Sequence, residues 1–134
     1  MAQNQPIIND PNLQAEIFVE GLCFPTSMSF IDNNNILVLE KEEGTVRLIS
    51  NGILQERPVL KVNVNSNNER GLLGIAIMNN HTVFLYYTES SSSEDNEPLG
   101  NRVYKYQWNE EEKLLVNPKL ILDLPAIPGP NHNG

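Results

Sequence analysis

The chain has 134 residues, the length of one ordinary domain, of which 40% are hydrophobic and 19% are charged. It carries 9 Lys and Arg against 17 Asp and Glu, and this net charge of -8 argues against binding to nucleic acid or to an anionic membrane surface. Cys23 is the only cysteine, which excludes an internal disulfide and a cysteine metal cluster. The amino terminus lacks the basic and apolar regions of a signal peptide, and no apolar stretch approaches the length of a membrane span.

Short apolar runs bounded by Gly, Pro, Asn and Asp predict β-strands along the chain after an extension over residues 1–14, and helix signals are almost absent. Tyrosines and a tryptophan on the later strands are expected to pack between sheets. In chain order the predicted strands are 15–20, 26–31, 36–41, 44–50 and 57–62, followed by a second set at 72–78, 82–88, 101–108 and 119–124.

The two sets of predicted strands match each other. Residues 27–41 align with residues 74–88 without a gap, at an offset of 47. The next strands of the two sets match at an offset of 57, and the last strands match at an offset of 62. One four-stranded unit therefore occurs twice, and the second copy has the longer loops.

A four-stranded unit repeated at this period is typical of a β-propeller blade, which buries its two faces only against neighbouring blades. Because propellers close with four to eight blades, residues 15–134 are expected to form the first two blades of a larger ring and to stop where a third begins. The strand predicted at 15–20 is well placed to complete the final blade of that ring. A sandwich of two four-stranded sheets is the alternative, and it leaves the end-to-end repeat unexplained.

The repeat places two polar pairs in equivalent links between blades. Glu69 and Arg70 follow the outer strand of the first unit at the same spacing at which Asn131 and His132 follow that of the second. Such links open on one face of a propeller, so the two pairs are expected to meet at one mouth of the central channel. Each pair also has an interpretation without a function. Glu69 and Arg70 could be a solvated ion pair beside a turn, and His132 could be a surface residue. The sequence contains no Gly-rich phosphate loop, no nucleophile elbow and no metal-ligand spacing.

Several segments resemble the glucose/sorbosone dehydrogenase family. They are residues 21–28 (GLCFPTSM), 39–41 with 44–47 (LEK, GTVR), 69–76 (ERGLLGIA), 83–88 with 101–103 (VFLYYT, NRV), and 122–125 leading to 128–134 (LDLP, PGPNHNG). The resemblance runs from about residue 16 to the end, and the order and spacing of the segments make it specific. It implies a six-bladed propeller of four-stranded antiparallel blades, in agreement with the repeat.

The resemblance also implies an oxidoreductase, a sugar dehydrogenase that binds pyrroloquinoline quinone (PQQ) with a calcium ion and oxidises aldoses at C1. Carried over by position, His132 would be the general base that takes the proton from the C1 hydroxyl, a task that suits imidazole. Glu69, Arg70 and Asn131 would contact the cofactor. Asn131 stands at a position where the family often has Asp. Glu69 stands at a position where the glucose enzyme has Gln. A carboxylate there would repel an anionic quinone, so Arg70 or calcium would have to neutralise Glu69. No metal ligand is assigned within the chain, because the calcium ligands of the family lie in later blades.

The alternative is a non-catalytic propeller of the same family, whose channel mouth binds a protein or a polysaccharide. A basic cluster in later blades would favour the enzyme. With about two blades, the chain by itself is expected to be inactive. The resemblance implies a small-molecule sugar substrate and export to the periplasm or the cell exterior, whereas the sugar and the electron acceptor do not follow from the sequence.

Overall fold

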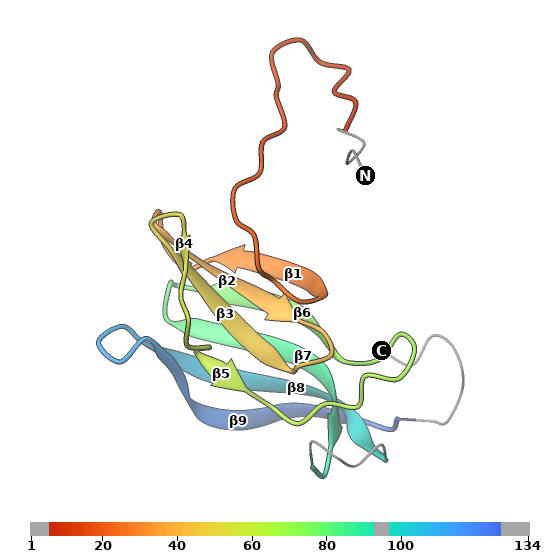
Figure 1. The fold of residues 1–134 in the computed structure, drawn as a ribbon. Helices are drawn as coiled ribbons and strands as arrows, with labels where there is room; N and C mark the ends of the chain where they lie inside the picture. The colour runs from red at the N-terminus through yellow and green to blue at the C-terminus, as the bar shows by residue number, and fades with distance from the viewer. Residues whose placement is uncertain (1–5, 93–96, 127–134) are drawn as a thin grey trace.

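A computed structural model describes residues 6–92 and 97–126. Within these ranges the chain forms two antiparallel β-sheets and no helix (Figure 1). The first sheet contains β1 (Pro25–Phe30), β2 (Asn35–Glu40), β3 (Thr45–Ser50), β4 (Ile53–Leu54) and β5 (Leu60–Lys61). The second sheet contains β6 (Leu72–Met78), β7 (Thr82–Ser90), β8 (Pro98–Asn109) and β9 (Leu114–Leu124).

Both sheets are meanders, and their strand registers confirm the predicted repeat. A β-bulge at the start of β1 recurs at the equivalent place in β6. On the outer strands, Leu60 pairs with Val46 in the first sheet, and their counterparts Leu122 and Val103 pair in the second. Because one register shift would turn every side chain to the other face, this agreement shows that the two sheets are copies of one unit.

The strand predicted at residues 15–20 is wrong, because this segment forms no strand in the structure. Apolar character favours a strand, but a strand also needs a neighbouring edge that takes its backbone hydrogen bonds. The segment is mostly exposed, and Val19 packs, together with Leu22 and Leu54, against Ile36, Val38 and Ile49 on the outer face of the first sheet. Ile17 and Phe18 remain largely exposed, at 68% and 62%.

Several other predicted strands differ in extent from the structure, above all the outer strand of each unit. Of the outer strand predicted at 57–62 only residues 60–61 form a strand, β5, and the equally short β4, which was not predicted, also pairs with β3. In the second sheet β9 begins at Leu114 rather than at residue 119, and β8 and β9 are the longest strands of the described chain.

The two sheets pack face to face over one hydrophobic core (Figure 1). Backbone hydrogen bonds also join them, from the Leu72 N–H to the Lys41 carbonyl at 3.1 Å and from the Leu115 N–H to the Val59 carbonyl at 3.0 Å. Removal of this apolar surface from water is the main force that holds the sheets together. The buried core residues are Ile31, Leu37, Leu39, Val46, Leu48, Val59, Leu72, Val83, Leu85, Tyr87, Tyr106, Trp108 and Leu115.

Candidate functional site

The link between β5 and β6 carries the first predicted pair of site residues. The N–H of Arg70 donates to the Asn67 carbonyl at 3.1 Å, and Asn68 has a left-handed φ of 54°, so residues 67–70 form a tight turn. Glu69 is exposed on this turn, whereas Arg70 is only 9% exposed. The link thus directs a carboxylate to solvent and keeps the adjacent guanidinium within the fold.

Lys41, which directly follows β2, holds this link in place. Its Nζ donates to the Asn68 carbonyl at 2.6 Å and to the Ser66 carbonyl at 3.4 Å. Gly71, with a φ of 134°, passes so close that a Cβ there would lie 2.7 Å from the Lys41 carbonyl oxygen. Sequence reasoning assigned Lys41 no role, because its partners on the link are distant in sequence and are backbone atoms.

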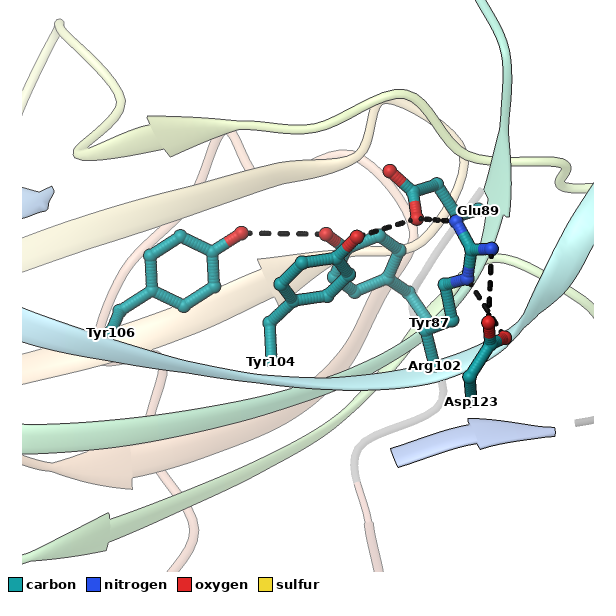
Figure 2. Close-up of polar contacts among 6 residues, drawn as sticks. All are labelled: Tyr87, Glu89, Arg102, Tyr104, Tyr106 and Asp123. Atoms are coloured by element: carbon teal, nitrogen blue, oxygen red, sulfur yellow. Dashed lines mark hydrogen bonds and ion pairs between the residues drawn. The ribbon is translucent and has the colours of Figure 1, made fainter. Parts of the chain in front are cut away.

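The end of β9, from which the chain continues towards Asn131 and His132, is held by Arg102 on β8 (Figure 2). Arg102 binds Asp123 through two hydrogen bonds of 2.9 and 3.2 Å, and its Nη1 lies 2.6 Å from Glu89. The hydrogen bonds to Asp123 and then to Glu89 raise the pKa of the Arg102 guanidinium further above its usual range. The strand end before the second link is therefore fixed by a bidentate ion pair.

Both links leave the same edge of the two stacked sheets. The Asn65 N–H donates to the Thr88 carbonyl at 2.9 Å, which ties the first link to the end of β7. The next residue on β7, Glu89, connects through Arg102 to Asp123 near the end of β9. Asn131 and His132 lie outside the described residues, so their meeting with Glu69 and Arg70 stays a prediction.

Three tyrosines stand beside Glu89 on the face of the second sheet that packs towards β5 (Figure 2). The Tyr104 hydroxyl donates to Glu89 Oε2 at 2.9 Å, and the hydroxyls of Tyr87 and Tyr106 lie 3.3 Å apart. The rings of Tyr87 and Tyr104 stack with their centroids 5.4 Å apart. Burial, together with the hydrogen bond to Tyr106, raises the pKa of Tyr87 far above its usual value, so this phenol stays neutral.

Two cationic residues belong to the link that carries exposed Glu69. Arg70 directly follows Glu69 and is only 9% exposed, and the Lys41 ammonium is bound to the Ser66 and Asn68 carbonyls of the same link. Calcium usually takes six to eight oxygen ligands, and residues 6–92 and 97–126 contain no group of three or more His, Cys, Asp or Glu that could hold a metal. Over the same ranges, no helix is long and apolar enough to cross a membrane.

Replacing Lys41 with Met tests whether the lysine holds the link. Met keeps the apolar stem beside Gly71 and removes the ammonium, so we expect the free energy of unfolding to fall by about 1–2 kcal/mol. Hydrogen exchange of the amides of residues 66–72 should become faster than in the wild type. Lys61→Met is the control, since the Lys61 ammonium is exposed and 4.0 Å from Glu43, and it should change stability by less than about 0.5 kcal/mol. Unchanged amide protection in Lys41→Met would contradict this role.

Comparison with known proteins gives a family match and a fold match. The model of the Glucose / Sorbosone dehydrogenase family matches residues 22–134. The PQQ-bound form of aldose sugar dehydrogenase from Streptomyces coelicolor superposes with a TM-score of 0.64 at 23% identity, over 78% of this chain and 31% of that chain. A crystal structure of glucose dehydrogenase superposes with a TM-score of 0.66 at 22% identity, over 79% of this chain and 31% of that one. A search of the curated proteins found no match.

These solved structures establish the architecture of the chain. At such low identity the similarity concerns the fold alone, and the chain spans about a third of the length of each structure. Together with the two stacked meanders, the similarity confirms the predicted all-β class and identifies the sheets as about two blades of a β-propeller. The link with Glu69 is accordingly a connection between two neighbouring blades.

Proposed function

Because this chain belongs to the Glucose / Sorbosone dehydrogenase family, we propose that the full-length protein oxidises an aldose sugar at C1 with PQQ as its cofactor. The proposal rests on the link between β5 and β6, which Lys41 anchors and which carries exposed Glu69 next to Arg70. The end of β9, from which the chain continues to His132, is held at the same edge of the sheets by the ion pair of Arg102 with Asp123. PQQ, when bound, supplies a two-electron acceptor for the hydrogen at C1. We also propose that the protein is exported to the periplasm or the cell exterior.

In this proposal the residues of the chain have separate tasks. The imidazole of His132 takes the proton from the C1 hydroxyl, because it is a base that works near neutral pH. The guanidinium of Arg70, which is largely buried in the link, balances the charge of Glu69 beside the cofactor. Asn131 contributes an amide beside the base. The ligands of a calcium ion would come from outside the described residues, which hold no metal cluster of their own.

The proposal is tested by dye-linked oxidation of a panel of aldoses with the full-length protein, before and after addition of PQQ and calcium. We expect turnover of at least one aldose that depends on added PQQ. Well-folded protein that neither turns over an aldose nor binds PQQ would exclude the enzyme and favour a propeller that binds a protein or a polysaccharide. The 134-residue chain alone is expected to be inactive, because its match covers only 31% of the PQQ-bound relative.

A further inference from the structure

A groove of about 420 Å³ lies between the two blades, outside the link that carries Glu69. Residues 60–63, on β5 and the start of the link, form one wall of the groove. The opposite wall is formed by the second sheet, with Tyr87, Glu89, Tyr104 and Tyr106 among its residues. This volume falls within the range of small-molecule pockets, and both walls belong to the described blades.

Glu89 lines this groove, and one of its two carboxylate oxygens accepts no hydrogen bond from the described residues. Its Oε2 accepts hydrogen bonds from Arg102 at 2.6 Å and from the Tyr104 hydroxyl at 2.9 Å. No group among the described residues donates to its Oε1, which Figure 2 shows pointing away from Arg102. The Glu89 side chain is only 23% exposed, so this oxygen is partly withdrawn from water and favours a donor in the groove.

The charge around Glu89 favours a cation as that donor. Arg102 is shared between Glu89 and Asp123, so these three groups together carry a charge of -1. Lys61 lies at the rim, with its exposed ammonium 4.0 Å from Glu43 Oε2. Because tyrosine rings attract organic cations and a carboxylate forms its strongest hydrogen bonds with charged donors, the inner end of the groove suits an ammonium group.

We propose that this interblade groove binds a small organic primary amine in its protonated form. The ammonium donates to Glu89 Oε1, and the hydrocarbon body lies between the tyrosine wall and the apolar side chains of Leu60 and Leu115. The site rests on contacts within the two described blades, so it is independent of the proposed sugar dehydrogenase activity.

The proposal is tested by NMR titration of the ¹⁵N-labelled full-length protein with 2-phenylethylamine, and with 2-phenylethanol as its uncharged analogue. We expect saturable shifts around Tyr87, Tyr104 and Tyr106 with a Kd that is roughly millimolar or tighter for the amine. The alcohol should bind about tenfold more weakly or worse, since it cannot form the ion pair. Glu89→Gln should weaken amine binding by a similar factor, whereas Lys61→Gln should leave it unchanged or tighter, because it removes a like charge at the rim.

A second measurement avoids dependence on the folding of the Glu89 variant. Raising the salt concentration from about 0.02 to 0.5 M should weaken binding of the amine severalfold and leave binding of the alcohol unchanged, because salt screens an ion pair. The proposal is overturned if folded wild-type protein shows no saturable binding, if the alcohol binds as tightly as the amine, or if neither salt nor Glu89→Gln changes the affinity for the amine.

Discussion

Replacing Gly71 with Ala is expected to lower the free energy of unfolding by roughly 3 kcal/mol or more. Gly71 has a φ of 134°, a conformation that residues with a side chain rarely adopt. An added Cβ would also lie 2.7 Å from both the carbonyl oxygen and the Cγ of Lys41. Lys41 has little freedom to move, because its carbonyl accepts the Leu72 N–H and its Nζ holds the Asn68 carbonyl. Chemical denaturation followed by circular dichroism measures the loss.

Gly52→Ala is the matched control for this substitution. Gly52 also has a positive φ, of 78°, but the nearest atom to an added Cβ is a ring carbon of Phe18 at 3.8 Å. Only the backbone strain remains, so we expect a loss of about 1 kcal/mol. If the two variants lost equal stability, the close approach of Gly71 to Lys41 would contribute nothing to the stability of the link.

In the full-length protein, His132→Ala is expected to lower kcat for aldose oxidation by a hundredfold or more, the order of effect that a lost general base produces. Alanine cannot accept the proton of the C1 hydroxyl, whereas the rest of the proposed site is left in place. PQQ binding should therefore persist, and it can be followed by the absorbance of the quinone. Steady-state rates at saturating sugar give the comparison with the wild type.

His81→Ala is the control for the loss of an imidazole elsewhere in the chain. His81 is exposed in the hairpin between β6 and β7, and its backbone carbonyl, which the substitution retains, accepts the N–H of Trp108 at 2.8 Å. We expect kcat within about twofold of the wild type, since exposed positions of this kind rarely affect a remote site. Turnover by His132→Ala at the rate of His81→Ala would exclude His132 as the base and leave the family membership unaffected.

The repeat of the four-stranded unit could be predicted from the sequence because strand identity and register depend on the local order of apolar and polar residues. Alternation and turn residues recur at fixed offsets, so the pairing of Leu60 with Val46 recurs as that of Leu122 with Val103. The same local reasoning was wrong for residues 15–20, because an apolar segment becomes a strand only where a neighbouring edge is available.

The sequence by itself determined the all-β class, the two blades and the position of Glu69 and Arg70 in an interblade link, since all of these follow from local pattern and spacing. Only the tertiary structure decided that Lys41 holds that link, that Arg102 joins Glu89 to Asp123, and that a groove opens beside Glu89. These contacts join residues distant in the chain, and they exist because the two sheets stack in one orientation. No local pattern encodes that orientation, which is set by the packing of the shared core.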